Sequence, residues 1–122
     1  MHACDKVALV TGAASGIGQA LAVAYAQAGV AVVGGYLPGA PHDPAATSAK
    51  VEAAGGQCLM LPVDVTRAEQ VEECASRAVA HFGRLDYAVA NAGLLRQAAL
   101  AEMSDAQWTE MIDVDLGGVM RV

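Results

Sequence analysis

Hydrophobic residues form two kinds of pattern along this chain. Short continuous apolar runs, which are typical of strands buried on both faces, occupy residues 7–10, 30–33, 58–61 and 85–90. Between and after these runs, apolar residues recur every three or four positions, as on one face of a helix, at residues 16–28, 45–54 and 66–82 and from residue 104 onward. Because strand and helix alternate without hairpin turns, the pattern predicts an open parallel α/β sheet with right-handed crossovers.

Glycine, proline and polar residues mark the expected helix boundaries. Gly29 is placed to end the first helix, and Asp43 followed by Pro44 is placed to begin the second; the pair Gly55-Gly56 then ends it. Two capping boxes are predicted to open the remaining helices: Thr66 with Glu69, and Ser104 with Gln107.

The order of these elements predicts a Rossmann-type doubly wound parallel sheet, three-layer α/β/α, with about four strands in the order 3-2-1-4. A chain of 122 residues is long enough for one domain of this kind. Doubly wound sheets ordinarily continue on the far side of the first strand. We therefore expect an incomplete sheet over residues 1–122, with its fourth strand exposed as a long apolar edge.

Composition and charge narrow the class of protein. The formal net charge of −6 argues against binding to nucleic acid or to an anionic membrane surface. Residues 7–41 carry no charge, but glycines divide this stretch into pieces of strand and helix length, which does not favour a membrane span. No signal-peptide pattern opens the sequence.

Cysteine and histidine residues suggest no metal or disulfide chemistry. The cysteines, Cys4, Cys58 and Cys74, are odd in number and lack a C-x-x-C spacing. They are expected to be reduced, partly buried thiols in a cytoplasmic protein. The histidines, His2, His42 and His81, share no spacing that suits a metal site.

A glycine-rich loop carries the first functional signal. Gly12-x-x-x-Gly16-x-Gly18 follows Thr11, at the point where the first predicted strand gives way to the first helix. Backbone amides and the helix dipole at such a junction bind a pyrophosphate. Gly12 would allow a sharp turn, Gly16 a close approach of the backbone to phosphate, and Gly18 close packing of helix on strand.

Four stretches, taken together, resemble the classical short-chain dehydrogenases/reductases. They are TGAASGIG at residues 11–18, DVT at 64–66, NAG at 91–93 and WTEMIDVDLGGV at 108–119. The resemblance covers essentially the whole chain and implies NAD or NADP as cofactor. It also implies reversible reduction of a ketone or oxidation of an alcohol, with a small carbonyl or alcohol compound as substrate. For a full-length enzyme it further implies a homo-oligomer.

The resemblance also assigns cofactor-binding residues. Its glycine loop supplies Gly12, Ser15, Gly16, Ile17 and Gly18, its adenine segment Asp64 and Val65, and its nicotinamide side Asn91, Ala92 and Gly93. From the residues alone other interpretations stay open. Asp64 could simply end a strand, and Asn91 could cap or form a turn beside Gly93.

The choice between the two cofactors is open. An acidic residue about 20 positions after the glycine loop ordinarily binds the adenosine ribose and repels a 2′-phosphate. Tyr36 stands there instead, with neither an acidic nor a basic neighbour, and Ser15 occupies a loop position that is often basic in NADP-preferring relatives. Tyr36 could stack on adenine or bond the ribose, or it could be a half-buried residue at the sheet edge.

The catalytic pair of the family is not in these 122 residues. Its Tyr-x-x-x-Lys pair lets a tyrosine, whose ordinary pKa is about 10, act as acid and base beside a cation. None of the tyrosines here is followed four positions later by lysine. Only the supporting asparagine of the family has a counterpart, at Asp115. Asp115 could be a polar side chain directed at an active site, or a partly exposed residue at a helix kink.

The sequence therefore predicts the cofactor-binding half of a short-chain dehydrogenase/reductase, truncated before its catalytic region and inactive alone. The alternative is a non-catalytic dinucleotide-binding module, or a subunit that a partner chain completes.

Overall fold

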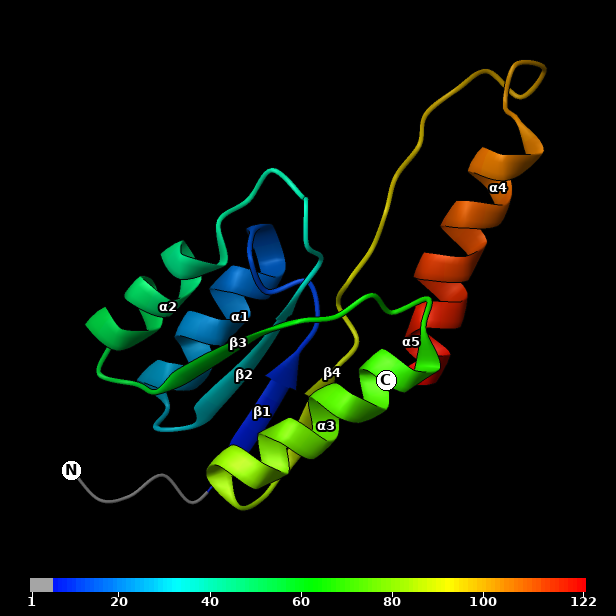
Figure 1. The fold of residues 1–122 in the computed structure, drawn as a ribbon. Helices are drawn as coiled ribbons and strands as arrows, with labels where there is room; N and C mark the ends of the chain where they lie inside the picture. Colours follow the sequence, from blue (N-terminus) through cyan, green and yellow to red (C-terminus); the bar gives the residue numbers. More distant parts are fainter. Residues whose placement is uncertain (1–5) are drawn as a thin grey trace.

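The computed structural model describes residues 6–122 and contains one parallel sheet (Figure 1). Cys4 and His2 lie outside the described residues. The strands are β1 (Val7–Val10), β2 (Ala31–Tyr36), β3 (Cys58–Pro62) and β4 (Tyr87–Val89). Their spatial order is β3-β2-β1-β4, and every neighbouring pair is parallel. This confirms the predicted order of strands.

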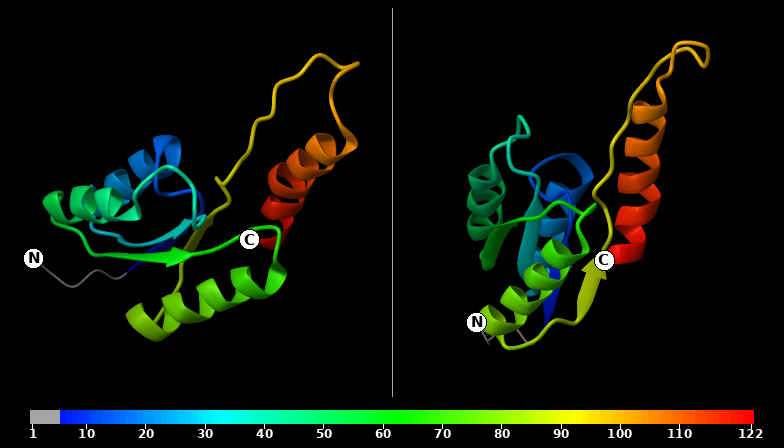
Figure 2. Two further views of the ribbon diagram at one scale, coloured as in Figure 1. Left: turned by 45° about the horizontal axis from the view of Figure 1, so that its top comes forward. Right: turned by 45° about the vertical axis from the view of Figure 1, so that its right-hand side comes forward.

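Helices cover both faces of the sheet, as Figure 2 shows from two sides. The helices α1 (Gly16–Gln27) and α2 (Pro44–Ala53) lie on one face, and α3 (Ala68–Phe82) lies on the other. The chain then forms α4 (Asp105–Ile112), a π-helical segment η1 (Asp113–Gly117) and α5 (Gly118–Arg121). These three run on as a nearly continuous helix that projects from the end of the sheet.

Two apolar clusters fix this layered arrangement. Alternate β2 residues point to opposite faces, because successive side chains of a strand do so. Val32 joins Ala22, Ala26 and Val51 under α1 and α2. Val33 joins a larger cluster under α3 that includes Leu9, Leu61, Val71 and Ala78. The continuous valine and alanine content of β1 and β2 follows from this burial on both faces.

Three strands differ in extent from the prediction, although β3 differs only by ending one residue later, at Pro62. β2 continues past Val33 to Tyr36, because Gly34 and Gly35 pair with β3 and pack closely against side chains of that neighbouring segment. β4 is shorter than predicted and ends at Val89, where its partner β1 also ends. The prediction of a long apolar edge at the fourth strand was therefore wrong. The edge strand has three residues, which pair with Ala8–Val10 of β1.

Two of the expected helix starts are confirmed. The Asp43 carboxylate accepts from the Ala45 N–H at 2.9 Å, with Pro44 as the first helical residue of α2. Ser104 and Gln107 form a reciprocal capping box at α4. Both caps use a side chain that is adjacent to the helix end in sequence.

The predicted capping box of Thr66 with Glu69 was wrong. The N-cap of α3 is Arg67, and it makes no side-chain cap hydrogen bond. The Thr66 hydroxyl instead donates to Asp64 Oδ1 at 2.7 Å, and the Thr66 N–H donates to the same oxygen at 2.9 Å. An aspartate two residues earlier therefore captures the hydroxyl that the helix end required.

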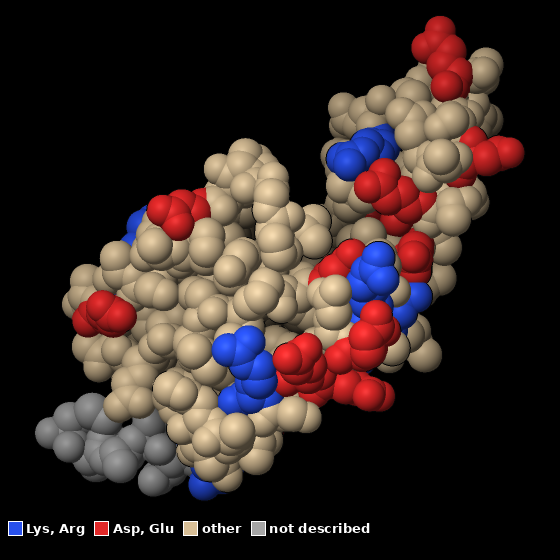
Figure 3. All heavy atoms as spheres, in the orientation of Figure 1, with Lys and Arg blue, Asp and Glu red and all other residues tan. Residues whose placement is uncertain are grey.

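Charged side chains of both signs mix on the surface in view in Figure 3, mainly over α3 and α4. No helix within residues 6–122 combines the length and the apolar character needed to cross a bilayer.

Cys58 is half-buried and Cys74 is buried; both are free thiols, and burial raises the pKa of each.

An acidic group stabilises the amino end of the sheet. Asp86, which precedes β4, accepts hydrogen bonds from Arg84 through both carboxylate oxygens, at 2.9 and 2.7 Å. It also accepts from the Val7 N–H at 2.8 Å. The Arg84 hydrogen bond, the Val7 N–H and the charges of Arg84 and Lys6 lower the pKa of Asp86 from 3.8 to about 2, against a smaller opposing effect of burial.

Asp86→Asn is expected to flatten the acid side of the stability profile. Because the folded pKa lies below the unfolded one, ionised Asp86 stabilises the fold above pH 3.8, and this stabilisation is lost as the pH falls toward 2. Urea unfolding between pH 2 and 7 measures it. The variant should be less stable than the wild type at neutral pH and converge with it in acid. Glu72→Gln, on the exposed face of α3, is the control; parallel profiles for Asp86→Asn and the wild type would contradict the role of Asp86.

Candidate functional site

A cleft of about 700 Å³ lies at the carboxyl ends of the strands. In Figure 3 the surface is hollowed between the loop that follows β2 and the projecting α4. Loops that follow all four strands line the cleft, as expected for an α/β sheet. Seven of the residues predicted from sequence lie on its wall: Gly12, Ser15, Tyr36, Asp64, Val65, Ala92 and Gly93.

The glycine loop turns sharply between β1 and α1. Gly12 has φ of +65°, and a Cβ there would lie 2.9 Å from Ala92 Cα. A Cβ on Gly18 would collide with the Gly12 carbonyl oxygen and lie 2.7 Å from Asn91 Nδ2. Both positions therefore require glycine: Gly12 for the turn, and Gly18 for the packing of α1 against the loop.

Hydrogen bonds from the chain after β4 hold this loop in place. Asn91 Nδ2 donates to the carbonyl oxygens of Thr11 at 3.1 Å and Gly12 at 3.4 Å. The N–H groups of Asn91 and Ala92 both donate to the Thr11 hydroxyl at 3.0 Å. Asn91 thus lies beneath the loop rather than on the wall of the cleft, and its amide fixes the turn from below.

The amino end of α1 opens at the cleft through Ser15. Ser15 is the N-cap residue, yet its side chain makes no cap hydrogen bond, and the first turn holds no acidic residue. The first amides of a helix lack partners within the helix and carry a partial positive charge. This end is therefore suited to bind an anion. Gly16, Ile17 and Gly18 form the first turn without lining the cleft, and Ile17 is 72% exposed.

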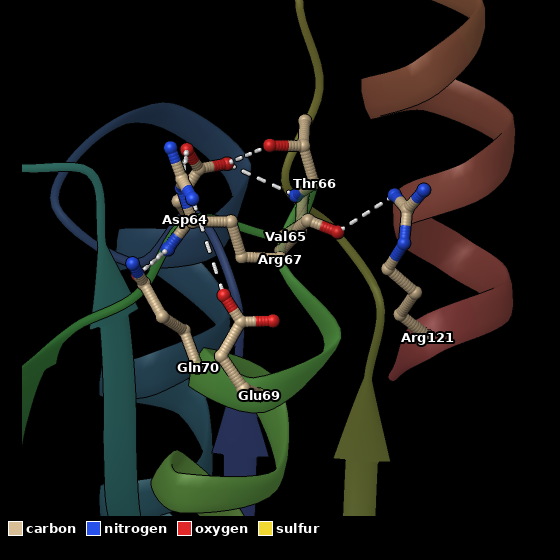
Figure 4. A network of polar contacts seen from close by, with 7 residues as sticks. All are labelled: Asp64, Val65, Thr66, Arg67, Glu69, Gln70 and Arg121. Carbon is tan, nitrogen blue, oxygen red and sulfur yellow. Dashed lines mark hydrogen bonds and ion pairs between the residues drawn. The ribbon is translucent and has the colours of Figure 1, made fainter.

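Asp64 and its neighbours form the polar wall beyond β3 (Figure 4). The Thr66 N–H and hydroxyl both donate hydrogen bonds to Asp64 Oδ1, and Gln70 Oε1 accepts from the Asp64 N–H at 2.8 Å. Burial by itself would raise the pKa of Asp64. The two Thr66 hydrogen bonds and the charges of Arg67 and Arg121 outweigh it, so the pKa is lowered. A fixed carboxylate therefore faces the cleft, where it can accept hydrogen bonds.

Tyr36 ends β2 and is half-buried on the same wall. Its carbonyl oxygen accepts from the Val63 N–H at 2.8 Å, which joins its backbone to the segment that leads to Asp64. The cleft continues over residues that sequence analysis missed: Leu37, Ala40, Pro41, His42, Arg96, Glu110, Asp113 and Val114. Of these, Arg96 and Glu110 form an ion pair at 3.3 Å.

Comparison with known proteins identifies the family of this chain. The family model for short chain dehydrogenase matches residues 6–122. The chain belongs to the short-chain dehydrogenase family. It is 40% identical over 117 residues to short-chain reductase protein NovJ of Streptomyces niveus, covering 96% of this chain and 44% of that protein. It is 38% identical to a 3-oxoacyl-(acyl-carrier-protein) reductase of Thermotoga maritima, covering 96% of this chain and 47% of that protein.

Solved structures of the family share the fold. Carveol dehydrogenase from Mycobacterium avium, solved in complex with NAD, superposes with a TM-score of 0.88 at 32% identity, covering 97% of this chain and 47% of that one. The chain spans about half the length of the curated relatives that it matches. The predicted family and Rossmann-type fold are thus confirmed, and NAD or NADP is the cofactor of the family.

Asp115 stands where the family pattern has asparagine, and it is exposed rather than buried. Its Oδ1 accepts from the Leu94 N–H at 2.7 Å, which joins the helix to the chain that leaves the cleft. Asp115 lies within the π-helical segment η1, so the expected regular helical stripe is interrupted here. Asp115 is thus an exposed residue in an irregular helix that braces one wall of the cleft, and its role at an active site stays a prediction.

Among residues 6–122, no group of three or more His, Cys, Asp or Glu side chains is placed to hold an ion.

Thr11→Val tests the connection beneath the glycine loop. Valine keeps the shape of the buried Thr11 side chain, which is 2% exposed, but removes the acceptor of two N–H groups. The Asn91 N–H keeps the Val89 carbonyl oxygen as acceptor at 3.0 Å, but the half-buried Ala92 N–H loses its partner, which should lower the free energy of unfolding by about 1–3 kcal/mol. Urea unfolding measures it. Thr109→Val on the exposed side of α4 is the matched control, with an expected change within about 0.5 kcal/mol. Equal stability of the two variants would show that the hydroxyl is dispensable.

Proposed function

We propose that this chain binds NAD or NADP in the cleft and serves as the cofactor-binding half of an oxidoreductase that interconverts alcohols and carbonyl compounds. A bound nicotinamide would donate or accept the hydride. One observation carries the proposal above the others: the uncapped amino end of α1, behind a glycine loop fixed by Asn91, opens into a cleft of about 700 Å³. The NAD in the carveol dehydrogenase structure supports the same assignment.

Each part of a dinucleotide has residues to bind it. The first-turn amides of α1, with Ser15 and Gly16, would bind the pyrophosphate. Asp64 and Val65 would receive the adenine. The Asp64 carboxylate can accept from the adenine amino group, and no hydrogen bond within the described residues uses the Val65 N–H.

The opposite end of the cleft would receive the nicotinamide. Ala92 and Gly93 line it directly, while Asn91 supports the loop from beneath. Asp115 would keep this wall in position through its hydrogen bond to the Leu94 N–H.

The proton-transfer residues are proposed to lie outside these 122 residues. The family reaction uses a Ser and a Tyr-x-x-x-Lys pair, and this sequence has no such pair. The relatives extend to about twice this length, which supports the interpretation of this chain as the first half of a longer enzyme, inactive by itself. In-frame coding DNA that continues into a Tyr-x-x-x-Lys motif would agree; a stop codon directly after Val122 would favour a module or a partner-completed subunit.

Exposed apolar side chains favour association with further protein. Large apolar residues with exposed fractions of 43–89% lie along α4, η1 and α5 and on the loop before them: Leu95, Leu100, Trp108, Ile112, Leu116, Val119 and Met120. Isolated exposed apolar residues are ordinary, but a series along one helical segment is typical of an interface. A homo-oligomer of the whole enzyme, or a subunit completed by a partner chain, would cover them.

Titration with NADH and with NADPH, followed by nicotinamide fluorescence, tests the binding function. We expect saturable binding of at least one dinucleotide, and competition by ADP-ribose because the pyrophosphate and adenine sites lie within this chain. Gly12→Val should weaken binding by at least about tenfold, because φ of +65° and the contact with Ala92 exclude a side chain. If neither dinucleotide binds to the folded protein, the proposal is wrong.

Tyr36→Asp is expected to shift the preference between the two cofactors. A carboxylate at the end of β2 can accept from the ribose hydroxyls of NADH and would repel the 2′-phosphate of NADPH. The ratio of the NADPH to the NADH dissociation constant should rise by about tenfold or more. Tyr36→Asn, which has the same shape as aspartate without its charge, should change the ratio much less. An unchanged ratio in Tyr36→Asp would place the ribose elsewhere.

A further inference from the structure

Arg121 reaches from α5 to the wall of the cleft (Figure 4). Its Nη1 donates to the carbonyl oxygens of Val65 at 2.9 Å and Asp113 at 3.1 Å, and its Nη2 contacts Asp113 Oδ1 at 2.6 Å. Val65 and Asp113 both line the cleft, although they are far apart in sequence. The side chain of Arg121 is 27% exposed, so these contacts are partly shielded from water.

The peptide between Val65 and Thr66 is held from both ends. Its carbonyl oxygen accepts from Arg121, and its N–H donates to Asp64 Oδ1 at 2.9 Å. A peptide that is bonded on both sides is fixed in rotation, and the two bonds polarise one another. The orientation of the Asp64 carboxylate therefore depends on Arg121 through a single peptide plane.

The attachment of α5 to the domain does not depend on Arg121 alone. Gly118 is buried against Val65, where a Cβ would lie 2.6 Å from Val65 Cγ2. Val122 packs against the apolar cluster beneath α3. Loss of the guanidinium should therefore leave α5 docked while releasing the peptide that it holds.

We propose that Arg121 is a positioning residue for the adenine end of the cleft: it fixes the Val65–Thr66 peptide, and through it the Asp64 carboxylate, in the orientation that reads the amino edge of adenine. This inference rests on the proposed dinucleotide-binding function and adds to it a residue outside the glycine, DVT and NAG motifs.

Replacing adenine by hypoxanthine in the dinucleotide tests whether the site recognises the amino edge of adenine. Adenine presents an amino donor beside a ring-nitrogen acceptor. Hypoxanthine presents a carbonyl acceptor beside an N–H donor, so a carboxylate next to a backbone N–H suits adenine only. The probes are NADH and reduced nicotinamide hypoxanthine dinucleotide, titrated by fluorescence. The wild type should bind NADH at least about tenfold more tightly than the analogue.

Arg121→Met, which keeps the aliphatic stem and removes the donors, should lose most of this preference. We expect NADH binding to weaken by about tenfold while binding of the hypoxanthine analogue changes little. Arg84→Met removes an arginine that bonds a carboxylate at the opposite end of the sheet, and it should keep the wild-type preference. Thermal unfolding of each variant separates a loss of stability from a loss of recognition.

The outcomes separate the inference from the function beneath it. A wild type that binds neither dinucleotide overturns the proposed function. A wild type that binds both equally, or an Arg121→Met variant that keeps the preference, overturns the role of Arg121 even where its melting temperature falls. If Arg121→Met does not fold, Arg121→Lys is decisive: one ammonium cannot reproduce the forked contacts, so an undiminished preference in that variant overturns the inference.

Discussion

The hydrogen bonds between the glycine loop and the start of the chain after β4 are the constraint on which this site depends. Asn91 and Ala92 bond Thr11 and Gly12 across about 80 residues of sequence. They fix the position at which β1 ends, and that position sets where α1 begins. The same bonds bring Ala92 and Gly93 to the cleft beside Gly12 and Ser15. One polar cluster beneath the loop therefore aligns the helix end, the loop and the opposite wall before any ligand binds.

Local signals in the sequence predicted most of the fold. The short apolar runs predicted the strands, and the glycines at positions 29 and 55 end two helices, where both adopt positive φ. The errors arose where a distant or nearby group competes with a local preference. Thr66 resembles a helix cap, but Asp64 takes its hydroxyl. The extent of β4 depends on how far β1 runs beside it, and no local feature of residues 85–90 records that.

The site was predictable where its residues belong to motifs and not where they belong to variable loops. The glycine, DVT and NAG stretches placed six of the predicted residues on the cleft, and the distance of Tyr36 from the glycine loop placed the seventh. His42 and Arg96 could not be identified, because their loops have no periodic pattern and their positions follow from the tertiary fold. Arg121 bonds Val65 across 56 positions, a contact that only the packing of α5 on the segment after β3 produces. This bond connects the projecting helix to the site that the motifs define, while the other two Arg121 bonds, to Asp113, lie within the helical segment itself.

The amino end of α1 and the segment after β3 are proposed to bind two parts of one adenine dinucleotide, the pyrophosphate and the adenine. Amide chemical shifts of the ¹⁵N-labelled protein, recorded during a titration with NADH, test it most directly. We expect saturable changes that are largest at residues 12–18, 64–66 and 92–94, with little change at residues 84–86 at the other end of the sheet. Changes confined to other surfaces, or none at saturating NADH, would contradict it.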